Sequence, residues 1–235
     1  MALPKLNESP HYEMVIPSTK KKVRYRPFLV KEEKNLMIAV ESKDTKAIIH
    51  TLLGTIESCV DDSIIPANLN TFDVEYMFLQ IRGKSVGETA KVSVKCQECG
   101  SEHPAEINLE DIQVNVPDID KTIQLTDNIA VELDWPSYSS LSEMDLSEDA
   151  GTEEMFKIMS KCFKSINTDE ERIDVKDTSP KELSDFIESM SSVQFAKIQE
   201  FVEAMPRLKH DIEFTCGSCQ HENKVTVEGL TGFLS

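Results

Sequence analysis

Four of the six cysteines form two Cys-x-x-Cys pairs, Cys96 with Cys99 and Cys216 with Cys219. Two thiolates separated by two residues can hold one face of a tetrahedral metal ion, and a second pair can close the coordination sphere. We therefore predict that the two pairs form one structural site that binds one zinc ion per chain. Such a site would join the middle of the chain to its C-terminal end.

Other uses of these residues stay open. A thioredoxin-type redox pair opens a helix after a strand, whereas strand-like residues follow both pairs here. A disulfide framework needs an oxidising compartment, and we find no signal peptide. An iron–sulfur cluster also takes four thiolates, and spacing does not separate it from zinc. His103 and His221 lie near the pairs, but four thiolates fill the sphere, so we expect both outside the ligand set. Cys59 and Cys162 stand in apolar helical patterns and are expected to be buried.

The cysteines are not accompanied by residues typical of an enzyme. The sequence has no Gly-x-Ser-x-Gly, phosphate loop, His-Glu-x-x-His or dinucleotide fingerprint, and its five histidines are scattered. Zinc held by four thiolates has no open coordination position and cannot activate water. We therefore expect a protein that is not an enzyme.

The net charge of -17 narrows the class of partner. So acidic a chain is repelled by nucleic acid and by anionic membrane surfaces, and we expect neither as a partner. No apolar run approaches the roughly 20 residues that span a bilayer. The charge is uneven, because residues 1–35 are basic and residues 141–154 are acidic. This asymmetry suits docking onto a protein or onto another copy of the chain, or it is solvated surface.

Strands on both sides of each pair would position the thiols. Apolar residues alternate at matching distances before and after each pair. These residues are Val92, Val94, Ala105 and Ile107 in the first segment, and Ile212, Phe214, Val225 and Val227 in the second. Each segment therefore predicts a hairpin with its cysteines at the turn, and two such hairpins are the pattern of a zinc ribbon. Gly100 and Gly217 suit the tight backbone of these turns.

The rest of the chain predicts an α+β fold. Residues 1–86 are expected to hold an N-terminal hairpin and a helical region. Residues 87–235 are expected to form a zinc-ribbon-like β region (about 88–135 and 207–235) with a helical insertion at 137–206.

Several positions sharpen this expectation. Leu36, Met37, Ala39 and Val40 form the expected inner face of a helix over 31–42. Thr71 should cap a later helix, and Ser179 with Pro180 should open another. Residues 122–133 predict a hairpin, Phe163 belongs to a helix begun at Thr152, and Trp135 is expected to anchor a core or an interface. An apolar tail at 229–234 is expected to fold back or to mark a contact site.

Three parts of the chain carry a family resemblance. Residues 25–34 (Tyr-Arg-Pro-Phe-Leu-Val-Lys-Glu-Glu-Lys), the Cys96–Cys99 pair and the segment from Cys216 to Leu230 resemble the baseplate hub assembly protein family of T-even-type contractile-tailed bacteriophages. The resemblance covers nearly the whole chain, and its Arg-Pro-Phe block is the most specific part. It implies a structural or assembly protein of the phage tail baseplate that contacts other hub or wedge proteins. Its expected location is the host cytoplasm during assembly, or the tail baseplate of the virion.

The sequence leaves open the role of one segment and one alternative function. The segment Arg26–Leu29 is either a docking element or a strand-to-helix corner in which Phe28 fills the core. The alternative function is a zinc-ribbon regulator that binds nucleic acid or polymerase, which would need a basic face on the ribbon. Lys91, Lys95, Lys209 and Lys224 are the candidates for such a face.

Overall fold

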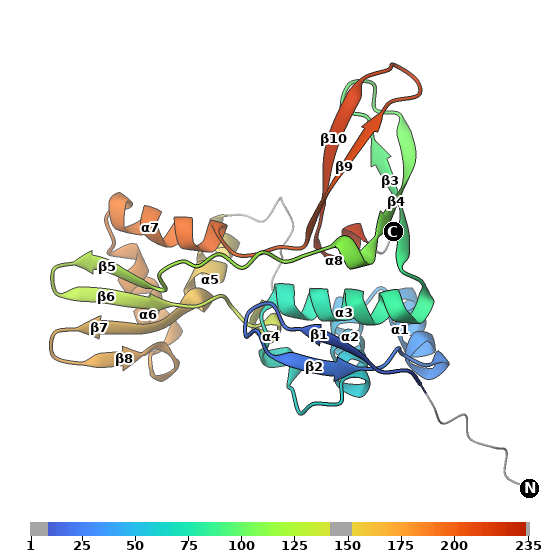
Figure 1. Ribbon diagram of the computed structural model, residues 1–235. Helices are drawn as coiled ribbons and strands as arrows, with labels where there is room; N and C mark the ends of the chain where they lie inside the picture. Colours follow the sequence, from blue (N-terminus) through green and yellow to red (C-terminus); the bar gives the residue numbers. More distant parts are fainter. Residues whose placement is uncertain (1–8, 142–151, 234–235) are drawn as a thin grey trace, which may run out of the picture. The chain divides into compact units, whose positions relative to one another are not determined.

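The computed structural model describes residues 9–141 and 152–233 and has the expected α+β composition. Its contacts divide the chain into two compact units (Figure 1). The first unit joins Met1–Asn115 to Arg207–Ser235, and the second is Val116–Pro206. The domain boundary expected at residue 86 stays a prediction.

The first unit begins with a hairpin that packs on helices. Its elements are β1 (Tyr12–Val15), β2 (Lys22–Tyr25), α1 (Val30–Ser42), α2 (Thr45–Cys59) and α3 (Thr71–Val86). One face of the hairpin is buried through Met14 and Val23, because strand side chains alternate between faces. The hairpin turn is tied to α3, where the buried Asp73 carboxylate accepts hydrogen bonds from the backbone N–H and the hydroxyl of Ser18.

Residues typical of N-caps precede α2 and α3, but the cap of α3 is not the residue that we expected. Asp44 precedes α2 and its side chain accepts from the Lys46 N–H, as an N-cap does. At α3 the expected cap was wrong, because Asn70 occupies the N-cap position and Thr71 is the first helical residue. The α3 side chains of Val74, Met77, Phe78 and Ile81 recur at helical spacing and are buried.

The inner face expected for α1 is only partly buried. Ala39 is buried, but Met37 is 59% exposed and Val40 is 60% exposed. Ile38 and Val30 are exposed as well. The helix contacts α2 through a narrow stripe, so much of its apolar surface has no partner among the described residues.

The segment Arg26–Leu29 forms the corner between β2 and α1. The Arg26 guanidinium lies 3.0 Å from the buried Glu32 carboxylate and also donates to the carbonyl of Ser58 near the end of α2. Glu32 in turn accepts from the Leu29 N–H at the start of α1. Phe28 is half-buried rather than a core residue. The corner therefore joins β2, α1 and α2.

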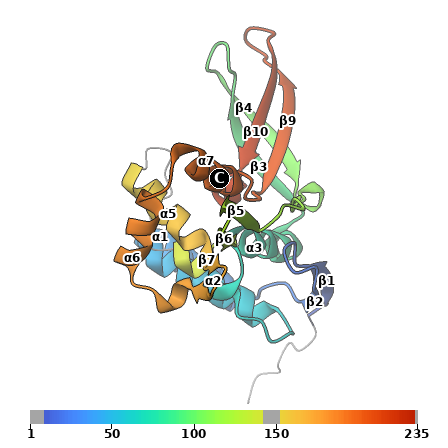
Figure 2. The same ribbon diagram turned by 90° about the vertical axis from the view of Figure 1, so that its left-hand side faces the viewer.

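Two further hairpins complete the first unit. Their strands are β3 (Thr89–Lys95) with β4 (Glu102–Asn108), and β9 (Lys209–Thr215) with β10 (Glu222–Glu228). Both are antiparallel, with Lys95 opposite Glu102 in one and Thr215 opposite Glu222 in the other. They lie side by side in both views (Figures 1 and 2) although they come from distant parts of the chain.

The chain end packs into the first unit. A short helix, α8 (Gly229–Gly232), follows β10 and contacts α3. Leu230 and Phe233 are buried, and the Leu230 N–H donates to the Glu75 carboxylate of α3. The described part of the apolar tail therefore folds back, and the last residue of the tail, Leu234, lies outside the described range.

The second unit contains a four-stranded antiparallel sheet in the order β5-β6-β7-β8. Its elements are β5 (Thr122–Thr126), β6 (Ile129–Leu133), α4 (Tyr138–Leu141), α5 (Thr152–Cys162), β7 (Phe163–Thr168), β8 (Arg172–Asp174), α6 (Pro180–Glu188) and α7 (Ser192–Glu203). Three 3-10 turns, at Pro66–Asn68, Leu109–Asp111 and Val175–Asp177, complete the described chain. The hairpin predicted at 122–133 is confirmed as β5 and β6.

The insertion predicted as helical is mixed. Phe163 begins β7 directly after α5, because the β-rich run that follows pairs with β6 instead of continuing the helix. Ser179 does cap α6, with Pro180 in the first turn and Glu182 completing a capping box. Trp135 is buried and stacks on Phe201 at 5.9 Å between ring centroids, which fits a core anchor.

Candidate metal centre

The turns of the two distant hairpins bring four thiols together. The sulfur atoms of Cys96, Cys99, Cys216 and Cys219 all lie within 4.8 Å of one another. The Cys96–Cys219 and Cys99–Cys216 sulfur distances are both 3.6 Å, and none of the cysteines forms a disulfide. A zinc–sulfur bond of about 2.3 Å sets the edge of a ZnS₄ tetrahedron at about 3.8 Å. The cluster therefore has the dimensions of a four-thiolate metal site.

The two hairpins are local repeats of each other. The second follows the first with an offset of 120 residues, from Cys96 to Cys216 and from Cys99 to Cys219. In each turn the first cysteine accepts a backbone hydrogen bond from the residue four positions later. That residue is Gly100 (φ 71°) in one turn and Gln220 (φ 61°) in the other. Gly217, which we expected to relax the second turn, does not occupy this left-handed position, so Gln220 adopts a conformation that favours glycine.

Backbone N–H groups in each turn point at the first sulfur. The N–H groups of Cys99 and Glu98 lower the pKa of Cys96. The Ser101 hydroxyl, followed by the N–H groups of Cys219 and Ser218, lowers the pKa of Cys216 to about 4. These bonds stabilise thiolates, the form that ligates a metal.

The second cysteine of the C-terminal pair behaves differently. The His221 N–H acts to lower the pKa of Cys219, but desolvation and the neighbouring cysteines raise it to about 12. Thiolates this close repel one another, so the cluster cannot hold four negative charges without compensation. A dication held by the four cysteines would supply that compensation and would keep its thiol ligands deprotonated.

Three further residues contact the thiols or their turns. From the sequence, His103 was expected outside the ligand set, and Ser101 and Asn223 were not named. The Ser101 hydroxyl lies 3.0 Å from the Cys99 sulfur and 3.3 Å from the Cys216 sulfur. His103 Nε2 lies 3.2 Å from the Cys216 sulfur. The buried Asn223 accepts from the backbone N–H of Gln97 at 2.9 Å. His103 was noticed in the sequence because it lies near the first pair. Only the repeat offset could have indicated Asn223.

The other cysteines and His221, which the sequence also drew attention to, are not part of the thiol cluster. Cys59 and Cys162 are buried as predicted, and burial raises their pKa values to about 11 and about 12. They therefore stay protonated and apart from the thiol cluster. The side chain of His221 is exposed. Among the described residues, the four cysteines are the group whose ligand atoms converge.

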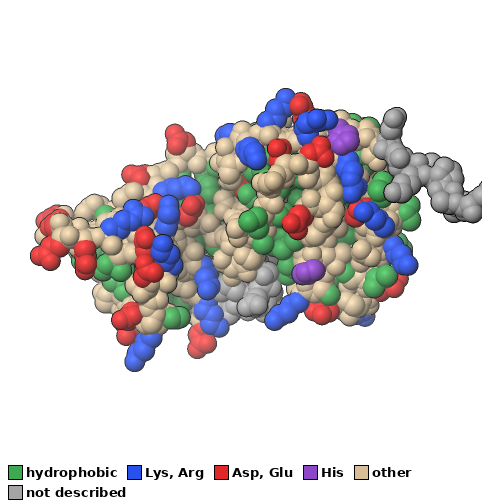
Figure 3. Space-filling model, turned by 90° about the horizontal axis from the view of Figure 1, so that it is seen from below, with side chains coloured by type: hydrophobic (Ala, Val, Ile, Leu, Met, Phe, Trp, Pro, Cys, Tyr) green, Lys and Arg blue, Asp and Glu red, His purple; other side chains and the backbone are tan. Residues whose placement is uncertain are grey.

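The four lysines proposed for a basic ribbon face are each next to a carboxylate. The nitrogen–oxygen distances are 3.7 Å for Lys91–Glu106, 3.5 Å for Lys95–Glu102, 3.0 Å for Lys209–Glu228 and 3.0 Å for Lys224–Asp211. Exposed pairs of this kind contribute little stability, but they neutralise the field that a polyanion would meet. Figure 3 views the molecule from below, away from these hairpins, and shows basic and acidic side chains interspersed on that other face. The geometry does not support the nucleic-acid alternative.

No helix in residues 9–141 or 152–233 combines the length and the apolar character that a span requires.

Comparison with known proteins places the chain in a family. Residues 9–235 match the family described as T4 bacteriophage base plate protein. One curated relative is "Baseplate hub assembly protein gp26" of Enterobacteria phage T4, which is 25% identical over 213 residues, 90% of this chain and 92% of the relative. No solved structure matches the chain. The match over nearly the full length, with the thiol cluster and the Arg26 corner inside it, shows that the chain belongs to the T4 bacteriophage base plate protein family.

Proposed function

We propose that this protein builds the hub of a contractile-tail baseplate through protein–protein contacts and performs no catalysis. The observation that carries the proposal is the family match over residues 9–235. The relative named as a hub assembly protein covers 90% of the chain and supports the hub specifically. The thiol cluster fits this role, because a closed four-thiolate site stabilises a fold and offers no position for a substrate.

We propose further that Cys96, Cys99, Cys216 and Cys219 bind one structural zinc ion and that the two hairpins form a zinc ribbon. Support comes from the 3.6 Å sulfur separations and from the N–H groups directed at the first cysteine of each turn. Elemental analysis of the purified protein should give about one zinc per chain. Iron with visible absorbance, or no metal in a folded chain, would contradict the zinc site without touching the family assignment.

The surface that suits a protein partner best lies on α1. Five of the large hydrophobic side chains exposed among the described residues belong to its start and its outer turns: Leu29, Val30, Met37, Ile38 and Val40. Apolar surface gathered in one place marks an interaction site more often than scattered single residues do. We therefore propose the α1 surface, defined by these five residues, as the contact with another baseplate protein.

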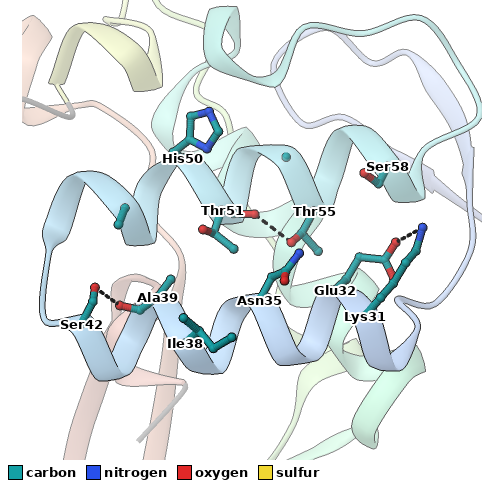
Figure 4. Close-up of a pocket in the computed structure, with 12 residues that line it drawn as sticks. Lys31, Glu32, Asn35, Ile38, Ala39, Ser42, His50, Thr51, Thr55 and Ser58 are labelled. Carbon is teal, nitrogen blue, oxygen red and sulfur yellow. Dashed lines mark hydrogen bonds and ion pairs between the residues drawn. The ribbon is translucent and has the colours of Figure 1, made fainter.

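A groove between α1 and α2 adjoins this surface (Figure 4). It has a volume of about 530 Å³. Its lining recurs every three or four residues along both helices: Lys31, Asn35, Ile38 and Ser42 on α1, and Ala47, Thr51, Gly54 and Ser58 on α2. The α1 positions run from Lys31 to Ser42, which is about 17 Å along the helix axis at about 1.5 Å per residue. Gly54 leaves open space where a side chain would stand, so a helix of the partner could approach closely.

Co-expression with the hub and wedge proteins, followed by affinity capture, tests the proposal. Wild-type protein should retain at least one of them. Met37→Asp should weaken that capture by about tenfold or more, since a buried interface anchor contributes roughly 2 kcal/mol. Val193→Asp is the matched control, because Val193 is a 73% exposed apolar residue on α7 in the second unit.

The outcomes separate the two parts of the proposal. If the wild-type protein captures no baseplate protein, the role in hub assembly is contradicted. If Met37→Asp binds like the wild type while Val193→Asp does not, the contact lies on the second unit and the α1 surface is wrong.

A further inference from the structure

Two residues at equivalent positions of the hairpin repeat reach across to the opposite hairpin. The 120-residue offset that relates Cys96 to Cys216 also relates His103 to Asn223. Both residues lie on the second strand of their hairpins. Each comes two positions after the residue whose backbone carbonyl accepts from the N–H of the first cysteine, which is Ser101 in one hairpin and His221 in the other. Each one contacts the turn of the other hairpin. The repeat therefore places two cross-hairpin contacts around the thiol cluster.

His103 belongs to the first hairpin but contacts the second. Its Nε2 atom lies 3.2 Å from the Cys216 sulfur and 3.1 Å from the Ser101 hydroxyl. Its ring packs against Phe214, with 5.3 Å between centroids, and Cε1 lies 3.8 Å from where a side chain on Gly217 would begin. The imidazole is thus held by the second hairpin with one nitrogen directed at the ligand sulfur.

Asn223 makes the reciprocal contact. Its Oδ1 accepts from the backbone N–H of Gln97, and its Nδ2 donates to the His221 carbonyl within its own hairpin. The side chain also hydrogen-bonds to Cys96, the first cysteine of the opposite turn. Asn223 is 4% exposed, so these bonds are made away from water. The Asn223 carboxamide therefore contacts the first cysteine of the opposite turn, as the His103 imidazole does at the other turn.

We propose that His103 and Asn223 are paired positioning residues of the metal site, each orienting the first cysteine of the opposite hairpin. The proposal rests on the zinc site proposed above. A four-thiolate zinc centre carries two net negative charges, and hydrogen bonds to its sulfurs spread that charge. His103 donates its Nε2 proton to Cys216, and Asn223 fixes the Cys96 turn. Neither is a metal ligand, because the four thiolates fill the tetrahedron.

Metal affinity, measured by competition with a chromogenic chelator, tests His103. His103→Ala should weaken zinc binding by about 10- to 100-fold, the usual effect of losing a hydrogen bond to a ligand. His103→Asn should recover most of this loss, since it places the Asn223 side chain at the equivalent position. His221→Ala is the matched control, because that exposed histidine lies next to the same cluster and contributes only backbone groups.

The cobalt(II)-substituted proteins provide a second readout. All three variants should keep the sulfur-to-cobalt charge-transfer band of four thiolates, because His103 is not a ligand. A weaker or shifted band in His103→Ala alone would overturn the proposal by making His103 a ligand. Zinc affinity within twofold of wild type in His103→Ala, or equal losses in His103→Ala and His221→Ala, would also overturn it. Absence of metal from the wild-type protein would instead refute the zinc site itself.

Discussion

Removing the proposed zinc ion should destabilise the first unit more than any single side-chain change on its surface. The metal would link Cys99 to Cys216, which are 117 positions apart in the sequence. In the unfolded chain a metal ion can bind one Cys pair easily, but it must close this long loop to bind both pairs. The folded hairpins hold the pairs together already, so the ion binds the folded chain more tightly than the unfolded one.

The loop length sets the size of the effect. A cross-link that closes 117 residues costs the unfolded chain about 4.9 kcal/mol of conformational free energy at 25 °C. Domains are typically stable by about 5–15 kcal/mol, so this one term is a large share of the total. Direct packing of the hairpins offsets part of it, and about 4.9 kcal/mol is an upper estimate of the loop contribution.

Urea denaturation and hydrogen exchange, with and without a chelator, measure the effect. Chelation should lower the unfolding midpoint and reduce amide protection in β9 (Lys209–Thr215) much more than in β6 (Ile129–Leu133) of the second unit. Cys99→Ser should reproduce the loss and should respond little to further chelator, because it already lacks a ligand. Ser218→Ala, an exposed substitution in the same turn as Cys216, should behave like the wild type.

Two results would contradict a stabilising metal cross-link in the first unit. An unfolding midpoint unchanged by chelation in metal-loaded protein would mean that the hairpins need no cross-link. Equal loss of protection in β6 and β9 would mean that the metal does not act through the first unit.

Three further changes test particular contacts. Asn223→Ala should cost about 1–3 kcal/mol in urea denaturation, because the backbone N–H of Gln97 loses its buried acceptor; a change below about 0.5 kcal/mol would contradict the contact. Burial raises the pKa of Glu75 from 4.5 to about 7, so its contribution to stability is full below pH 4.5 and is lost as pH rises to about 7. Glu75→Gln should therefore flatten the stability profile across that range, and an unaltered profile would refute the assignment. Glu32→Ala should cost about 1–3 kcal/mol, because the Arg26 guanidinium loses its carboxylate partner and the Leu29 N–H loses its acceptor, whereas the exposed Lys34→Ala control should cost less than about 0.5 kcal/mol. Equal effects of these two changes on stability would contradict a structural role for the Arg26–Glu32 ion pair and would favour the docking-element interpretation of Arg26–Leu29.

Several residue patterns with a short period were read correctly from the sequence, although the N-cap of α3 is Asn70 and not the expected Thr71. The hairpins around both Cys pairs, the hairpin at β5 and β6, and the cap at Ser179 all depend on neighbours within a few positions. Errors arose where a distant segment decided the outcome. Phe163 continues an apolar helical pattern, yet it starts β7 because β6 offers it a partner strand. Met37 fits the inner face of α1, yet it is exposed because α2 covers only one stripe of that helix.

The sequence by itself determined that two Cys-x-x-Cys hairpins exist and that their thiols have the chemistry of a metal site, because both follow from residue type and spacing. Only the tertiary structure decided that the four sulfurs converge within 4.8 Å. It also decided that His103 and Asn223 reach across the hairpins, that the ribbon lysines are neutralised, and that α1 leaves apolar surface exposed. The physical reason is that convergence and exposure depend on which surfaces pack together across 117 positions of chain, and local spacing carries no information about that.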